Sequence, residues 1–217
     1  MSGDVRPESD QHANPPTPAD VWDGRYAGDS YVYGTEPNDF LRNTVADVPP
    51  GDVLCLADGE GRNGVYLAEH GHRVSSVDLS QRGLEKAERL AAERGVKVHT
   101  IVADLGSFDL GIDRWDLIVS IFAHTPPKVR ARIHAAIATA LRPDGLFILE
   151  SYTPDQIGRG TGGPPSAKFT MTLAELRAEL TTMNIVRGEE LVRPVLEGPG
   201  HTGDGAVVQV IATPSEP

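Results

Sequence analysis

The stretch that decides the fold is residues 55–68, CLADGEGRNGVYLA, which contains Gly59-Glu60-Gly61-Arg62-Asn63-Gly64, a G-x-G-x-x-G pattern. Glycines in this pattern let a bound cofactor approach the backbone at the start of a helix, and the pattern is typical of dinucleotide-binding proteins. Two carboxylates, Asp58 and Glu60, lie in the same loop, however. Each close contact of a carboxylate with a pyrophosphate would cost on the order of 1 to 4 kcal/mol at the dielectric of a protein surface. The loop therefore favours a cofactor that has no pyrophosphate.

The composition is that of a globular protein with an acidic surface. The chain has 217 residues, a formal net charge of −11 and a single cysteine, Cys55. The charge argues against nucleic-acid or anionic-membrane binding, and one cysteine can form no intramolecular disulfide. There is no signal pattern at the N-terminus and no apolar run of membrane-spanning length, so we expect a cytoplasmic protein. Residues 1–20, polar and rich in proline, are predicted to be a disordered tail, and residues 21–217 a single domain.

Short apolar runs alternate with segments of helical periodicity along the rest of the chain. Strands are predicted at 53–57, 73–77, 96–102, 115–122 and 146–150, and helices follow the first, second and fourth of them. Another helix should begin at the capping box of Thr172 and Glu175, and residues 185–196 and 206–212 should form an antiparallel hairpin. The predicted fold is therefore α/β, doubly wound and Rossmann-like, with a seven-stranded, mostly parallel sheet that ends in a C-terminal antiparallel hairpin.

Acidic residues follow three of the predicted strands. Ligands of open α/β sheets bind at the carboxyl ends of the strands, where Asp58, Asp78 and Asp104 should lie. These carboxylates suit a cofactor with ribose hydroxyls, an adenine amino group and an ammonium but no phosphate, which describes S-adenosylmethionine. Asp78 could accept from both ribose hydroxyls and Asp104 from the adenine amino group. Gly59 and Gly61 would let the backbone come close to this cofactor.

Three stretches resemble the class I S-adenosylmethionine-dependent methyltransferases. Residues 53–80, VLCLADGEGRNGVYLAEHGHRVSSVDLS, are similar to the first two motifs of that family, VADL at 102–105 to the third, and LRPDGLFILE at 141–150 to its Pro-Gly turn and fifth strand. The resemblance extends over roughly residues 21–212, terminal hairpin included. GRNGVYLA, together with WDGRY and YGTEPNDFL upstream, is most like the small bacterial tellurite-resistance and thiopurine-type branch.

The resemblance implies further cofactor contacts. Cys55 and Ala57 occupy the positions where the family usually places an acid, so Asp58 or Glu60 is expected to hold the cofactor ammonium, and the choice between them stays open. The segment with Arg25 and Tyr26 should lie over the methionine end, where Arg25 could pair with the carboxylate; a solvated arginine is the alternative. The remaining predicted cofactor contacts lie in or beside the motif stretches and are Leu79, Leu105 and Ile121.

The candidate catalytic residues are His124 and Tyr152. They follow the fourth and fifth predicted strands, at the edge where the methyl group would point, although His124 could equally cap a loop. Tyr31, Tyr33 and Phe40 are candidates for the acceptor pocket, with simple packing as the alternative. Residues 158–165, GRGTGGPP, are predicted to be a mobile flap near the pocket. His201 cannot be placed from the sequence.

The segments outside the core sheet are too short to wall in anything but a small methyl acceptor. Among small acceptors, the resemblance favours a thiol or a metalloid nucleophile. The scattered histidines predict no metal site, and the sequence makes no prediction of oligomeric state. Two alternatives remain at this point, an NAD-dependent oxidoreductase and a non-catalytic S-adenosylmethionine-binding protein.

Overall fold

A single mixed sheet organises the protein. The computed structural model describes residues 15–215, and the strand order is β3-β2-β1-β4-β5-β7-β6. The strands are β1 (Asp52–Leu56), β2 (Arg73–Asp78), β3 (His99–Val102), β4 (Trp115–Ile121), β5 (Leu141–Tyr152), β6 (Met183–Leu196) and β7 (Thr202–Pro214). β1 to β5 pair in parallel, whereas β7 is antiparallel to both β5 and β6. The predicted fold class is confirmed, terminal hairpin included.

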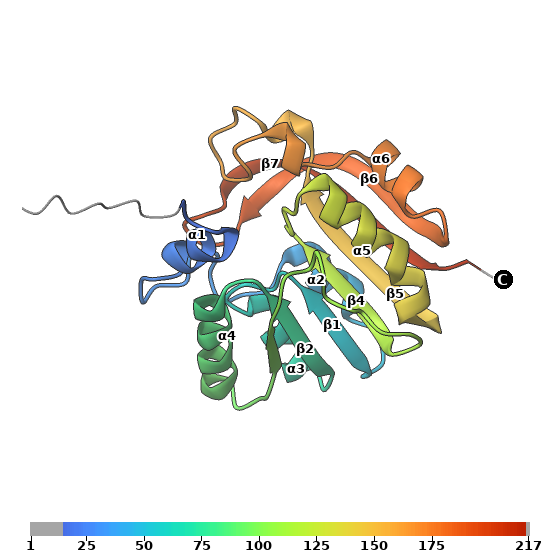
Figure 1. The fold of residues 1–217 in the computed structure, drawn as a ribbon, viewed down its shortest axis with the longest axis horizontal. Helices are drawn as coiled ribbons and strands as arrows, with labels where there is room; N and C mark the ends of the chain where they lie inside the picture. The colour runs from blue at the N-terminus through green and yellow to red at the C-terminus, as the bar shows by residue number, and fades with distance from the viewer. Residues whose placement is uncertain (1–14, 216–217) are drawn as a thin grey trace, which may run out of the picture.

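Helices cover both faces of the sheet (Figure 1). They are α1 (Pro18–Arg25), α2 (Asp39–Val45), α3 (Arg62–Glu69), α4 (Gln81–Glu93), α5 (Pro127–Ala140) and α6 (Leu173–Glu179), with short 3₁₀ turns at Pro154–Gln156 and Ala167–Phe169. α5 and α6 pack their apolar side chains on one face, and α2 and α3 pack on the other. The parallel strands β1, β2 and β4 are thereby buried on both sides, which explains their continuous apolar runs, whereas β3 at the edge of the sheet remains partly exposed.

Strands β3, β5 and β7 differ most from their predicted ranges. β7 covers Thr202–Pro214 rather than residues 206–212, because it pairs with β6 over this whole length. β3 begins at His99 rather than residue 96, because the amide of Val96 still donates to the carbonyl of Ala91 and closes the end of α4. β5 begins at Leu141 rather than residue 146, because Leu141 pairs with Trp115 of β4 before the register shifts. The first residues of β3 and β5 are thus decided by contacts that the apolar content of the local sequence does not predict.

The N-terminal boundary also differs from the prediction. Most of the tail predicted at residues 1–20 lies outside the described residues. α1 nevertheless begins at Pro18, inside that range, because Thr17 and Asp20 form a capping box and Pro18 occupies the first helical position. Within residues 15–215, no helix has the length and apolar character needed to cross a bilayer.

Sharp turns end the two central strands at their carboxyl edge. Ala57 after β1 and Phe122 after β4 have φ values of 51° and 52°, in the left-handed region that residues with a side chain rarely adopt. The chain therefore leaves each strand abruptly, and the residues that follow gather at one edge of the sheet. Such strained backbone is characteristic of functional sites.

Candidate cofactor and acceptor site

A cavity of about 470 Å³ lies at the carboxyl ends of the central strands. This volume is within the range of small-molecule sites. Most of the residues predicted from the sequence line it, namely Tyr26, Asp58, Gly59, Glu60, Asp78, Leu79, Asp104, Leu105, Ile121 and His124. Three predicted residues, Arg25, Gly61 and Tyr152, are not part of its lining.

Asp78 fixes the glycine loop from the end of β2. Its Oδ2 accepts from the amide of Gly59 at 2.8 Å, and its Oδ1 accepts from the amide of Ser80 at 2.8 Å. Burial raises the pKa of Asp78. Because each carboxylate oxygen can accept a second hydrogen bond, Asp78 retains room for two ligand hydroxyls.

A side chain is excluded at Gly59 and at Gly61 for different structural reasons. A Cβ on Gly59 would lie 2.7 Å from Oη of Tyr26, at the cavity wall. A Cβ on Gly61 would lie 2.4 Å from Cβ of Ala87, and Gly61 has a φ of 84° at the start of α3. Gly61 therefore permits α3 to pack closely against α4, and this explains why it is absent from the cavity lining.

Glu60 has its carboxylate occupied by the protein itself. It is paired with the ammonium of Lys86, and its Oε2 accepts from the amide of Val32 at 2.8 Å. Both side chains are almost completely buried. Glu60 therefore anchors the segment after α1 to α4, and it has little capacity left for a ligand.

Asp58 is the less committed of the two loop carboxylates. Its Oδ2 accepts from Oγ of Ser76 at 2.5 Å, and the absence of a side chain on Gly64 leaves room for this contact. Burial raises the pKa of Asp58 to about 7. A cation bound next to Asp58 would restore its ionised form, so the site is suited to an ammonium.

Asp104 follows β3 and lines the cavity. It is exposed, and its Oδ1 accepts from the amide of Gly106 at 2.7 Å. The Asp104 side chain is thus oriented by a hydrogen bond within its own turn, whereas its Oδ2 accepts no hydrogen bond from the described residues. Leu79, Leu105 and Ile121 supply apolar wall around it.

Arg25 lies outside the cavity lining. Its Nη1 donates to Oη of Tyr33 at 2.8 Å, and its guanidinium carbon is 5.0 Å from the centre of the Trp22 ring. Tyr26 is buried at the cavity wall, stacked on Trp22 with 5.7 Å between the ring centres. α1 therefore covers the cavity with aromatic rings, while Arg25 reinforces that cover from outside.

His124 and Tyr152 stack on one another at the other wall. Their ring centres are 5.7 Å apart with an angle of 11° between the planes. Burial lowers the pKa of His124 to about 4, so its ring is neutral near pH 7. Because Nδ1 lies 3.2 Å from the carbonyl oxygen of Phe169, a neutral ring donates from Nδ1 and leaves a lone pair on Nε2. Tyr152 is fully buried, and burial raises its pKa.

The cavity lining also includes polar and aromatic residues that had no predicted role from the sequence. Among them are Arg62, Phe122 and His201. The ring of Phe122 lies 4.7 Å from that of His201 and 4.6 Å from that of Tyr152, measured between centres. The only sequence signal for Arg62 was its position directly after the glycine loop. Of the three aromatic residues suggested for the pocket, Tyr33 lines the cavity, whereas Tyr31 and Phe40 pack in hydrophobic clusters.

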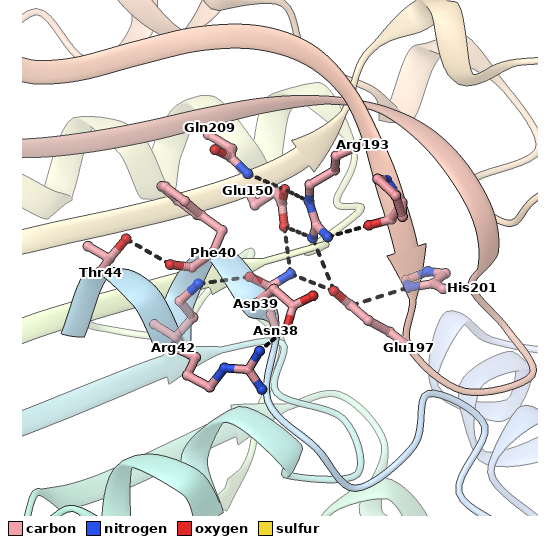
Figure 2. Close-up of polar contacts among 12 residues, drawn as sticks. Asn38, Asp39, Phe40, Arg42, Thr44, Glu150, Arg193, Glu197, His201 and Gln209 are labelled. Carbon is pink, nitrogen blue, oxygen red and sulfur yellow. Dashed lines mark hydrogen bonds and ion pairs between the residues drawn. The ribbon is translucent and has the colours of Figure 1, made fainter. Parts of the chain in front are cut away.

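A buried polar network, formed by Asn38, Glu150, Arg193, Glu197 and Gln209, supports this wall from behind (Figure 2). Arg193 binds both oxygens of Glu150 at 2.7 and 2.6 Å, and Gln209 donates to the same carboxylate. The amide of Asn38 donates to Glu150 and, at 2.9 Å, to Glu197. Burial alone would raise the pKa of Glu197, but His201, Arg62 and Arg193 lower it to about 2. The network joins α2, β5 and the terminal hairpin into one rigid unit.

The segment predicted to be a mobile flap lies against this wall. Oγ1 of Thr161 donates to the carbonyl of Asp204 at 2.9 Å, and the amide of Thr202 donates to the carbonyl of Thr161. Glycines allow the close approach, since a Cβ on Gly162 would lie 2.4 Å from the carbonyl oxygen of Gly200. Between residues 15 and 215, no three His, Cys, Asp or Glu side chains converge on a possible metal position.

The sheet order and the cavity at its carboxyl edge define a doubly wound α/β fold with a small-molecule site. Residues 53–145, less than half of the chain, match the family described as "Methyltransferase domain". The central part of the chain is thus similar to methyltransferase domains, in agreement with the predicted cofactor, S-adenosylmethionine.

Individual relatives are more distant. An uncharacterized methyltransferase, YbaJ of Bacillus subtilis, is 27% identical over 103 residues, which cover 47% of this chain and 40% of that protein. The match thus spans less than half of the length of YbaJ.

Solved structures extend the similarity to most of the chain. A structure from work on the conversion of a disulfide bond into a thioacetal group during echinomycin biosynthesis has a TM-score of 0.73 at 20% identity, covering 91% of each chain. TehB from Haemophilus influenzae has a TM-score of 0.68 at 16% identity, covering 91% of this chain and 67% of that one. The 1,6-didemethyltoxoflavin-N1-methyltransferase of Burkholderia thailandensis, with bound S-adenosylhomocysteine, has a TM-score of 0.59 at 25% identity, covering 82% and 76%. The first two likenesses concern the fold.

Proposed function

We propose that this protein methylates a small molecule at the expense of S-adenosylmethionine. The observation that carries the proposal is the cavity at the strand ends, where Asp58 and Asp78 provide carboxylates beside Gly59. When bound, S-adenosylmethionine supplies an electrophilic methyl group on a sulfonium sulfur. Because Glu60 is paired with Lys86, a pyrophosphate cofactor such as NAD would instead face Asp58 and Asp78, which argues against an oxidoreductase.

Each cofactor residue has a role that follows from its place in the wall. Asp78 accepts from the ribose hydroxyls, and Asp104 accepts from the adenine amino group. Asp58 holds the ammonium, because Glu60 is already bound to Lys86 and two backbone amides. The apolar side chains beside them, namely Leu79, Leu105 and Ile121, enclose the adenosine. Tyr26 and the rest of α1 close the methionine end.

Positioning is the main contribution of the protein to the reaction. Holding two reactants in line at attack distance can supply about 7 to 11 kcal/mol of the barrier. His124 is neutral with a pKa of about 4, so it is a weak base, and its Nε2 is better suited to orient an acceptor by accepting a hydrogen bond. Phe122 and Tyr152 keep this end of the cavity apolar around it.

The acceptor that needs no strong base is a soft nucleophile, a thiolate or a reduced metalloid. The weak basicity of His124 supports this choice, and so does the resemblance of residues 61–68 to the tellurite-resistance and thiopurine branch. The structural neighbour from echinomycin biosynthesis also concerns chemistry at sulfur. A single domain over residues 21–217 leaves room for a small acceptor only.

Incubation of the protein with methyl-labelled S-adenosylmethionine and a panel of thiols, selenite and tellurite tests the proposal. We expect label in at least one acceptor, and its loss in the Asp78→Asn variant, with Asp109→Asn, at an exposed loop carboxylate, as the matched control. Tight cofactor binding without transfer to any acceptor would indicate a binding protein. Reduction of NAD by a small alcohol would indicate the oxidoreductase alternative.

A further inference from the structure

Arg62 has one half of its guanidinium committed and the other half free. It is the first residue of α3 and is 7% exposed. Its Nη2 donates to Oε2 of Glu197 at 2.5 Å, whereas its Nη1 has no hydrogen-bond partner within residues 15–215. A buried charged donor without a partner costs more than about 1 to 3 kcal/mol, and folded proteins leave few such groups unpaired. Arg62 therefore has an unused donor in the wall of the cavity.

The charges behind Arg62 are already balanced. Two guanidinium groups, those of Arg62 and Arg193, face two carboxylates, those of Glu150 and Glu197. Glu197 accepts from Arg62, Arg193 and Asn38 together, so it holds the Arg62 side chain in one orientation. A rigid guanidinium with one edge free is the usual protein device for binding an oxyanion.

The free edge belongs to the acceptor end of the cavity. The carboxylate that holds Arg62 also lies 3.7 Å from Nδ1 of His201, which adjoins Phe122 and, through it, Tyr152. One further atom of the cavity lining, Nε2 of His124, is buried without a partner in the described part of the chain. The carboxylates proposed for the ribose and the adenine follow β2 and β3, whereas Asp58, proposed for the ammonium, follows β1 as Arg62 does, so a variant of Arg62 has to separate the acceptor from the cofactor.

We infer that the methyl acceptor carries an anionic oxygen group, a carboxylate or an inorganic oxyanion, and that Nη1 of Arg62 binds this group. The inference rests on the proposed function, since it places the acceptor beside the methyl group. Arg62 supplies the charge, and the Nε2 lone pair of His124 accepts from a protonated atom of the acceptor. Neutral and cationic acceptors would leave Nη1 unpaired, so the site selects against them.

An isosteric pair of thiols tests the inference on the wild-type protein. Thioglycolate and thioglycolamide differ only in the carboxylate, and selenite provides the inorganic arm. With S-adenosylhomocysteine saturating, calorimetry should show thioglycolate or selenite binding about tenfold to a hundredfold more tightly than thioglycolamide, the range for a hydrogen bond to a charged group. Tighter binding of thioglycolate would indicate that the acceptor is a carboxylate, and tighter binding of selenite would indicate that it is an inorganic oxyanion. If neither thioglycolate nor selenite binds more tightly than thioglycolamide, the inference is overturned.

The Arg62→Lys variant separates the acceptor from the cofactor. Lysine keeps the positive charge and can keep the ion pair with Glu197. Its side chain has a single nitrogen, however, so it has no second donor group equivalent to Nη1 of arginine. We expect the preference for thioglycolate to fall to within about threefold, with the affinity for S-adenosylhomocysteine unchanged. Arg73→Lys, at the exposed amino end of β2, is the control. If the variant keeps its preference for thioglycolate over thioglycolamide but loses tenfold in affinity for S-adenosylhomocysteine, Nη1 belongs to the cofactor site and the inference is overturned. Methyl transfer to both thiols would in that case leave the proposed function standing.

Discussion

Asp58 should make cofactor binding depend on pH. Its pKa is raised to about 7, so about 3% of the side chain is ionised at pH 5.5 and half at pH 7. The cofactor ammonium stays protonated over this range, because α-amino groups titrate near pH 7.7. If only the ionised carboxylate binds the ammonium, the apparent Kd should fall about fifteenfold from pH 5.5 to pH 7. The pKa of His124, about 4, lies below this window.

Calorimetric titration with S-adenosylhomocysteine measures this directly. Runs at pH 7 in two buffers of different ionisation enthalpy should report the release of about half a proton per bound ligand, because binding restores the ionised form of Asp58. The Asp58→Asn variant should bind more weakly and lose most of the pH dependence. A Kd that stays constant from pH 5.5 to pH 7, or an Asn variant that keeps the wild-type dependence, would refute the reasoning.

Asp58→Asn should weaken cofactor binding, but it should increase the stability of the ligand-free protein at high pH. A carboxyl group whose pKa is raised on folding contributes stability below its unfolded pKa, 3.8, and that stability is lost as the pH rises through about 7. At pH 8 the wild-type protein therefore carries a buried charge that Asp58→Asn removes. The variant should melt a few degrees higher than wild type at pH 8, corresponding to about 1 kcal/mol, and the difference should shrink at pH 4. A lower melting temperature at pH 8 would contradict the cause assigned to the pKa shift.

Three further substitutions test other parts of the site. Asp78→Ala should weaken S-adenosylhomocysteine binding by about 1.5 to 3 kcal/mol, since it removes a charged acceptor for two hydroxyls, and an unchanged Kd would mean that Asp78 serves only the loop. His124→Ala should keep turnover within about tenfold for a low-pKa thiol, whereas a loss near a thousandfold would indicate general-base catalysis and an oxygen or nitrogen acceptor. Asn38→Ala should lower the free energy of unfolding in urea by about 3 kcal/mol, because it removes the cap of α2 and donors to Glu150 and Glu197. The exposed Asn43→Ala in the same helix should change it by less than about 0.5 kcal/mol, and equal effects of the two would contradict the role given to the network.

The parts of the fold predicted from the sequence were those with local causes. Thr172 with Glu175 caps α6, as expected, because this cap needs only two residues that lie three positions apart. The strand ends carry the acidic residues to one edge because parallel strands share their direction, which the alternating pattern already implied. The starts of β3 and β5 were wrong because they depend on a helix end and on a neighbouring strand.

The missed parts of the site depend on distant residues. The choice between Asp58 and Glu60 turns on Lys86, which lies 26 residues beyond Glu60 and takes up its carboxylate. Arg62 meets Glu197 across 135 residues, and no local pattern signals such a pair. His201 could be placed only once the terminal hairpin was folded against the end of β5.

The melting temperature with different nucleoside ligands tests the central claim, that the acidic cavity holds S-adenosylmethionine. A ligand at one hundred times its Kd adds about 2.7 kcal/mol to the free energy of unfolding, which for a chain of 217 residues corresponds to a rise of roughly 5 to 10 °C. We predict this rise with S-adenosylmethionine and with S-adenosylhomocysteine, and none with NAD at the same concentration. A rise with NAD alone, or no rise with either adenosyl ligand, would contradict the claim.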